Sequence, residues 1–394
     1  MLDSLKRKVV PLDLEDILAS VMRRTRLEDL DDPQCKDSLK ILIASCNLEA
    51  SLSLVGRIAA RQHLQDLLET RLRLIDYWRQ TPEIQKQTVH PPLFITGSPK
   101  SGSTFLHRLC AEDPSNRVPR TWEVMFPLPP PARDTFDSDP RIMQTEDRLR
   151  WLNRMQPEVT KAHPVGARLL QECGPILGYT FRSHVFLDIF WIPSYETWLR
   201  SQDLGPSYKF HMNFLKHLPW LCPGERWVLK SSDHVHALAT LFETYPEAGV
   251  IFLHRDPMKV LQSSSSQMTL LKDTFSRSID PRRLGANEAR ILTDKLNKII
   301  EFRNSHAHME DRFIDVRYLN LANDPIGTMR VIYDRFGLTL SPLAEVRMEA
   351  CIKDECVKRS ADKYFLGDFG LDPQHEDPQF AAYRERFRVE REPL

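Results

Sequence analysis

A short, mainly apolar run that ends in a glycine- and serine-rich loop constrains the fold of this chain most. Residues 93–96 read Leu-Phe-Ile-Thr, residues 97–104 read Gly-Ser-Pro-Lys-Ser-Gly-Ser-Thr, and an apolar helical pattern follows at Phe105, Leu106 and Leu109. This order predicts a strand, a tight loop and a helix. Glycines let such a loop turn so that its N–H groups point at an anion, and the helix N-terminus adds its dipole. We therefore expect a cradle for a phosphate or sulfate group.

Three later segments repeat the strand–helix order. Residues 227–229, 250–253 and 313–316 are short, largely apolar runs, and each is followed by a helical pattern. Alternating strands and helices favour a parallel sheet, so we predict an α/β protein with a P-loop-like parallel sheet flanked by helices. The first 90 residues show helical periodicity and almost no glycine, which predicts a helical N-terminal extension (1–90) before the main domain (91–394).

One helix of the extension has an apolar face that we expect to pack against the body of the protein or against a second subunit in a homo-oligomer. Its residues recur at steps of three and four: Leu64, Leu67, Leu68, Leu72, Ile75 and Trp78.

Composition excludes several classes of protein. Lys and Arg together number 54, as do Asp and Glu, so no global charge attracts nucleic acid or an anionic membrane surface. Seven cysteines without a CxxC pair favour reduced thiols in a cytoplasmic protein. The chain has no secretory signal at its N-terminus and no run of about 18 apolar residues, so we expect no transmembrane segment. No set of residues has metal-ligand spacing, and we predict no metal site.

The loop differs from that of nucleoside triphosphate enzymes at one decisive position. It shares the two glycines and the final hydroxyl of G-x-x-x-x-G-K-[ST], but Ser103 replaces the lysine and the only lysine is Lys100. Phosphoryl transfer uses the later lysine together with magnesium, whereas a less charged sulfuryl group needs fewer positive charges. A nucleotide kinase or other NTPase stays an alternative, as does a non-catalytic nucleotide-binding protein.

A second pattern follows the third predicted strand. Residues 251–257 read Ile-Phe-Leu-His-Arg-Asp-Pro, in which the Asp-Pro pair suits the start of a helix. Ser263 comes eight residues after Arg255, about two helical turns onward. With this pattern and the loop, the chain resembles the sulfotransferases that use 3′-phosphoadenosine 5′-phosphosulfate (PAPS), and most of all a large, mostly bacterial branch of that family.

The resemblance implies both an activity and a binding site. Residues 99–104 resemble the P-K-S-G-[ST]-T loop that binds the 5′-phosphosulfate, and Arg255 with Ser263 resembles the pair that binds the 3′-phosphate. The implied enzyme transfers a sulfuryl group from PAPS to a hydroxyl of a small-molecule acceptor without a metal. The residues implied to bind the donor are Lys100, Ser101, Gly102, Ser103, Thr104, Arg255 and Ser263.

Other segments extend the resemblance over much of the chain from residue 92, the sulfotransferase domain. Residues 121–123, 227–231, 316–318 and 368–371, with Tyr364, resemble the bacterial branch, and His163 and Glu172 match motif positions to which we assign no role. The chain departs from that branch's commoner P-R-[ST]-G-T-T loop at Lys100 and Ser103, and both exchanges keep the chemistry. The first 90 residues match only loosely.

Two residues are candidates for the base that removes the acceptor's proton. Glu123 follows Lys100 by 23 residues, the approximate distance of the catalytic glutamate in tyrosylprotein and several bacterial sulfotransferases, and it is the favoured candidate. His234 follows the strand that ends at Lys230, as the histidine base of cytosolic sulfotransferases does, but two residues later than in that family. Glu123 paired with Arg120 and His234 beside a helix cap are the structural alternatives. Lys230 is expected to hold the transferred group or to form a surface ion pair.

Two further sets of residues suit either a substrate pocket or ordinary structure. The proline-rich segment 124–141 suits a pocket wall or a surface loop. Six aromatic residues suit a pocket or the core: Trp122, Phe126, Phe190, Trp191, Tyr195 and Trp198.

Overall fold

The computed structural model describes residues 9–155, 164–276, 279–355 and 365–393. His163, Cys356 and Tyr364 lie outside the described residues. At the centre of the fold is a five-stranded parallel sheet with the strand order β2-β3-β1-β4-β5. Its strands are β1 (Leu93–Gly97), β2 (Asn116–Arg117), β3 (Arg226–Lys230), β4 (Gly249–His254) and β5 (Phe313–Arg317). The predicted fold class and its four predicted strands are confirmed, whereas the two-residue strand β2 was not predicted.

The side chains of the strands divide between two apolar layers. Ile95 and Ile251 pack with α5 (Ser103–Ala111), α16 (Tyr318–Asn323), α17 (Pro325–Arg335) and α18 (Pro342–Glu355) on one face. Phe94 and Phe252 belong to the larger core on the other face, with α12 (Gly205–His217), α13 (Leu238–Thr244) and α15 (Pro281–Ser305). Successive strand residues point to opposite faces, so a central strand that is covered on both sides must be apolar throughout.

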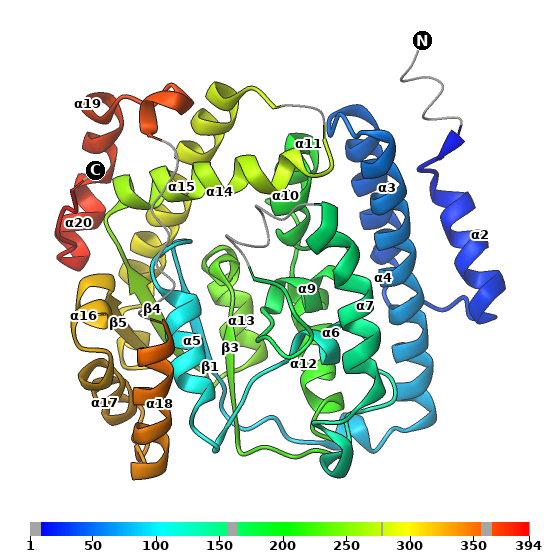
Figure 1. The fold of residues 1–394 in the computed structure, drawn as a ribbon, viewed down its shortest axis with the longest axis horizontal. Helices are drawn as coiled ribbons and strands as arrows, with labels where there is room; N and C mark the ends of the chain where they lie inside the picture. Colours follow the sequence, from blue (N-terminus) through cyan, green and yellow to red (C-terminus); the bar gives the residue numbers. More distant parts are fainter. Residues whose placement is uncertain (1–8, 156–163, 277–278, 356–364, 394) are drawn as a thin grey trace.

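The remaining helices surround this framework (Figure 1). The α-helices are α2 (Leu14–Thr25), α3 (Gln34–Leu48), α4 (Leu54–Gln80), α6 (Thr121–Met125), α7 (Pro140–Met155), α9 (Cys173–Gly178), α10 (Val185–Ile189), α11 (Pro193–Leu199), α14 (Pro257–Asp273), α19 (Pro373–Glu376) and α20 (Ala381–Phe387). The 3-10 turns are η1 (Ile84–Lys86), η2 (Arg133–Thr135), η3 (Ser232–Ala237), η4 (Ala307–Arg312), η5 (Leu366–Phe369) and η6 (Asp377–Phe380).

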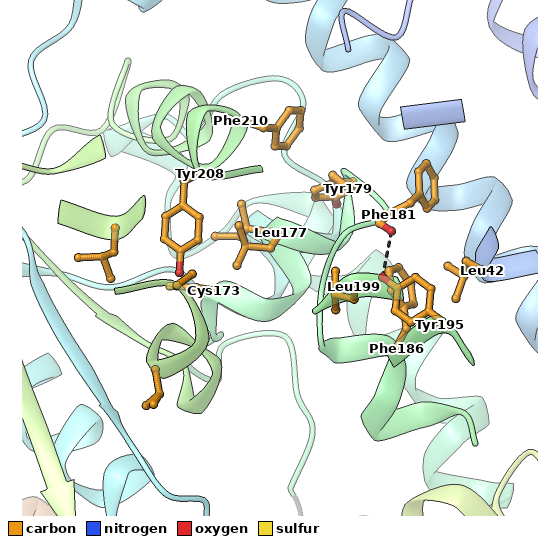
Figure 2. Packing of buried hydrophobic residues seen from close by; sticks show 14 of the residues in the cluster. Leu42, Cys173, Leu177, Tyr179, Phe181, Phe186, Tyr195, Leu199, Tyr208 and Phe210 are labelled. Atoms are coloured by element: carbon orange, nitrogen blue, oxygen red, sulfur yellow. Dashed lines mark hydrogen bonds between the residues drawn. The ribbon is translucent and has the colours of Figure 1, made fainter. Parts of the chain in front are cut away.

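The N-terminal helices pack against the body of the protein. All six residues of the predicted apolar face are buried in the larger core, and the ring of Trp78 lies 5.2 Å from that of Phe210 on α12. Leu42 of α3 lies close to Phe186 and Tyr195, whose hydroxyl donates to Phe181 O at 3.0 Å (Figure 2). Burial of one such side chain contributes about 2 kcal/mol, so these contacts hold the extension firmly. The boundary at residue 90 stays a prediction.

The order of the strands brings three loops together. β1 pairs with β3 on one side and β4 on the other, all in parallel, so the loops that follow these strands meet at one edge of the sheet. This is where ligands bind in open α/β sheets. Gly97 ends β1 with φ of 134°, and a Cβ there would lie 2.3 Å from the carbonyl oxygen of Leu253 on β4. Only glycine allows the two strands to approach so closely at the start of the glycine- and serine-rich loop of residues 97–104, called the phosphate loop below.

Candidate active site

A cavity of about 1070 Å³ opens at this edge of the sheet. Lys100, Thr104 and Arg255 line it near the strand ends, while Leu187 and Trp191 line it near α10. Phe190 and Trp191 are therefore the members of the aromatic set that face a pocket, whereas Trp122 and Tyr195 are buried in the protein. The proline-rich segment 124–141 contributes no residue to the lining.

The phosphate loop has the conformation of an anion cradle. The backbone has positive φ at Lys100 (59°) and at Gly102 (90°). A turn of this kind can point successive N–H groups toward the same side, where they can bind an anion. α5 begins at Ser103, so the positive end of its dipole adjoins the loop. Lys100, Gly102, Ser103 and Thr104 line the cavity. Ser101 is buried and donates its hydroxyl hydrogen to Ser98 O at 2.6 Å, so this side chain fixes the shape of the loop.

Arg255 joins the phosphate loop from the end of β4. Its Nη1 donates to Lys100 O at 2.7 Å, and its guanidinium lies 4.0 Å from the centre of the Tyr318 ring. Its Nε and Nη2 donate to the Glu392 carboxylate at 2.9 and 3.0 Å. The arginine thus holds a carboxylate with the paired donors that suit a phosphate.

Ser263 and Ser264 lie on α14, the helix that begins two residues after Arg255. Both side chains are buried, and Ser264 is the one that lines the cavity. Ser263, the residue predicted from the spacing to Arg255, is not in the lining.

Lys230 connects the end of β3 to the phosphate loop. Its buried Nζ donates to Thr104 Oγ1 at 3.0 Å and forms an ion pair with Glu172 Oε1 at 2.6 Å. Glu172 immediately precedes α9, lines the cavity and keeps 43% of its side chain exposed. Lys230 is thus a buried cavity residue, and its ion pair joins it to a carboxylate that is exposed in the cavity.

Glu123 lies on α6, fully buried and outside the cavity lining. Both of its carboxylate oxygens contact Arg117, with Arg117 Nη1 3.1 Å from Oε2, and Oε2 also accepts from Arg120 N at 2.8 Å. These contacts cap the start of α6 and neutralise a buried arginine. Glu123 as the base stays a prediction, and its surroundings in the structure are those of a structural ion pair.

His234 also lies outside the cavity lining. Its Nδ1 is 2.7 Å from the Tyr208 hydroxyl, and its ring packs against Phe94 in the core. Burial lowers the pKa of His234 to about 4. The residue lies on the 3-10 turn η3, where side chains three positions apart share a face. Asp233 and His236 share the face that lines the cavity, and His234 lies between them on another.

A cluster of polar side chains near α10 lines the cavity and was not predicted from the sequence. Asp233 accepts from Lys295 Nζ at 2.9 Å, and the rings of His184 and His236 stack at 4.5 Å. Asp188 is exposed toward the cavity, and enclosure by protein together with the nearby Asp233 carboxylate raises its pKa to about 8. The available signal was the aspartate and histidines of residues 231–236, but only the 3-10 turn shows which of them share a face.

Fold and cavity together define a P-loop-like α/β protein whose glycine- and serine-rich loop lines a cavity of about 1070 Å³. A profile of the sulfotransferase family matches residues 91–342, more than half of the chain. This chain belongs to the sulfotransferase family.

Known proteins share its fold over nearly the whole length. The crystal structure of sulfotransferase STF1 from Mycobacterium tuberculosis H37Rv is 30% identical, with a TM-score of 0.83 over 94% of this chain and 98% of that one. Sulfotransferase STF9 from Mycobacterium avium is 24% identical, with a TM-score of 0.88 over 96% of this chain and 98% of that one, and shows the same fold.

A curated relative from Mycobacterium bovis carries a substrate in its name. It is the omega-hydroxy-beta-dihydromenaquinone-9 sulfotransferase Stf3, 24% identical over 261 residues. The match spans 63% of this chain and 63% of the length of that relative.

Among residues 9–155, 164–276, 279–355 and 365–393, no three His, Cys, Asp or Glu side chains group as metal ligands. Within the same ranges, no helix combines the length and apolar character that crossing a bilayer requires. The cytoplasmic location stays a prediction.

Proposed function

We propose that this sulfotransferase moves a sulfuryl group from PAPS to the hydroxyl of a small-molecule acceptor. The observation that carries the proposal is the contact between two anion-binding elements: Arg255 Nη1 donates to Lys100 O at 2.7 Å, and both residues line one cavity. PAPS carries anionic groups at its 5′ and 3′ positions, which suits two adjacent basic elements. The cavity of about 1070 Å³ is at the upper end of the sizes of ligand pockets, which suits a donor and an acceptor bound side by side.

The phosphate loop binds the 5′-phosphosulfate in this proposal. The N–H groups of the loop, Ser103, Thr104 and the N-terminus of α5 surround the anion, and Ser101 fixes the loop. Lys100 stabilises the negative charge that develops on the 5′-phosphate oxygen as the bond to sulfur breaks. Arg255 receives the 3′-phosphate together with Ser264, which lines the cavity about two turns into α14, and the neighbouring Ser263 stays the residue predicted from the sequence.

The wall of the cavity supports an acceptor with an apolar body. Leu187, Trp191, Met268 and Ile291 line the part of the cavity near α10, beside the polar side chains of Asp188, Asp233 and Lys295. The curated relative is named for a hydroxylated menaquinone, a largely apolar molecule that carries a hydroxyl. We therefore propose an alcohol or phenol on an apolar scaffold as the acceptor.

A labelled-donor screen tests this proposal. The protein is incubated with ³⁵S-labelled PAPS and a panel of apolar alcohols, quinols, phenols and sugars, and products are identified by mass spectrometry from the gain of one sulfuryl group. Transfer to an apolar alcohol or phenol is the expected result. The absence of transfer to any acceptor, water included, refutes it, and magnesium-dependent ATP turnover instead of transfer supports the kinase alternative.

A further inference from the structure

The cavity contains several carboxylates, and only some are suited to receive a proton from an acceptor. Glu196 is held by Arg200 and Arg290, and Asp233 is held by Lys295. Glu288 is buried on α15. Glu172 is also paired with a lysine, but that lysine, Lys230, contacts Thr104 of the phosphate loop.

Two distances locate Glu172 relative to the phosphate loop. Glu172 Oε1 lies 2.6 Å from Lys230 Nζ, and Lys230 Nζ lies 3.0 Å from Thr104 Oγ1 in the first turn of α5. One lysine therefore separates the carboxylate from the loop that holds the transferable group. A group within hydrogen-bond reach of an acceptor at this position is in the correct place for general base catalysis.

Exposure separates Glu172 from the two bases predicted from the sequence. Its side chain is 43% exposed and lines the cavity, so an acceptor hydroxyl can reach the carboxylate. Glu123 is 0% exposed and His234 is 1% exposed, and neither lines the cavity. A proton cannot pass directly from an acceptor in the cavity to either of them without a rearrangement of the core.

We propose that Glu172 is the general base of the sulfuryl transfer, an inference that rests on the proposed function. As the acceptor oxygen forms its bond to sulfur, its proton passes to the Glu172 carboxylate, and the bond from sulfur to the bridging oxygen breaks. The electron pair of that bond stays on the 5′-phosphate of adenosine 3′,5′-bisphosphate. Lys230 lies between Thr104 and Glu172, positions the carboxylate and contacts the oxygens of the transferred group. Glu172 then releases its proton to solvent.

The variant Glu172→Gln keeps the size of the side chain and a hydrogen bond to Lys230 but cannot accept the proton. Turnover should fall by about a hundredfold or more, the usual contribution of a general base. The dissociation constant for adenosine 3′,5′-bisphosphate should stay within about threefold of wild type, because a base acts on the acceptor. Glu112→Gln is the matched control, a cavity glutamate at the opposite end of α5 from the loop, and it should keep wild-type turnover.

A series of substituted phenols separates a catalytic from a merely structural role. A more acidic phenol gives up its proton more readily and depends less on a base. The loss of turnover in Glu172→Gln should therefore become smaller as the pKa of the phenol falls. A structural defect would lower the rate of sulfation of all phenols by the same factor. If no phenol is sulfated, the turnover of Glu172→Gln is compared with that of Glu112→Gln with water as the acceptor.

The outcomes assign failure to one proposal or the other. Wild type that transfers to no acceptor refutes the proposed function and this inference with it. Active wild type beside a Glu172→Gln enzyme within about threefold of it overturns this inference alone. A folded Glu123→Gln or His234→Gln enzyme with the larger loss and the phenol dependence assigns the base to that residue instead.

Discussion

Replacement of Arg255 by alanine tests the assignment of the two anion sites most directly. In the structure its Nε and Nη2 hold the Glu392 carboxylate, and its Nη1 holds Lys100 O. The donor's 3′-phosphate should displace Glu392 and take over the same pair of N–H groups. Arg255→Ala should therefore weaken binding of adenosine 3′,5′-bisphosphate and leave binding of adenosine 5′-monophosphate, which lacks the 3′ group, nearly unchanged.

The size of the effect follows from this exchange. Hydrogen bonds to charged groups contribute about 1.5–3 kcal/mol each, but the wild-type protein must give up the Glu392 pair to form the new one. A net loss of about 2 kcal/mol corresponds to binding about 30-fold weaker. Glu392→Gln removes the competing charge and should tighten binding about fivefold, a gain that disappears when Arg255 is also alanine.

Isothermal titration calorimetry at fixed salt measures both ligands on the four proteins of this double-mutant cycle. Salt is kept constant because charge pairs near the surface are screened. Two results would refute the reasoning. Unchanged binding of the bisphosphate by Arg255→Ala removes the residue from the 3′-phosphate site. Equal weakening of both ligands means that Arg255 acts through Lys100 O on the shape of the phosphate loop.

Three further predictions concern stability, metals and pH. Glu123→Gln removes the buried negative charge that pairs with Arg117 and should lower the free energy of unfolding by about 3 kcal/mol. Urea titrations measure this change, and an unchanged midpoint contradicts the structural ion pair. Sulfuryl transfer should survive excess EDTA, and a loss that magnesium alone restores favours the kinase alternative. Because the pKa of Asp188 is raised to about 8, its stabilising contribution is present at low pH and is lost as pH rises toward that value. Asp188→Asn should thus raise the melting temperature relative to wild type more at about pH 9 than at about pH 5, and an equal shift at both contradicts the assignment.

Local patterns in the sequence predicted the framework of the fold. Central strands such as residues 250–253 are covered on both faces and must be apolar, and Gly97 and Gly102 are needed where the backbone has positive φ. These requirements act within a few residues, so they can be read from a short stretch of chain. The two-residue strand β2 (Asn116–Arg117) is too short and polar to leave such a pattern.

Tertiary structure decided which side chains reach the cavity. Glu123 and Glu172 are both glutamates near a helix start, but α6 turns one toward Arg117 in the interior while the other faces Lys230 in the cavity. His234 and His236 differ by two positions on a 3-10 turn, which sends one into the core and the other to the cavity lining. Contacts such as Arg255 with Glu392 join residues far apart in the chain. Four of the five strands, the phosphate loop and the family could be predicted from the sequence, because each depends on neighbouring residues. The partners and exposure of each ionisable group depend on elements packed together from the whole chain, so they follow only from the three-dimensional fold.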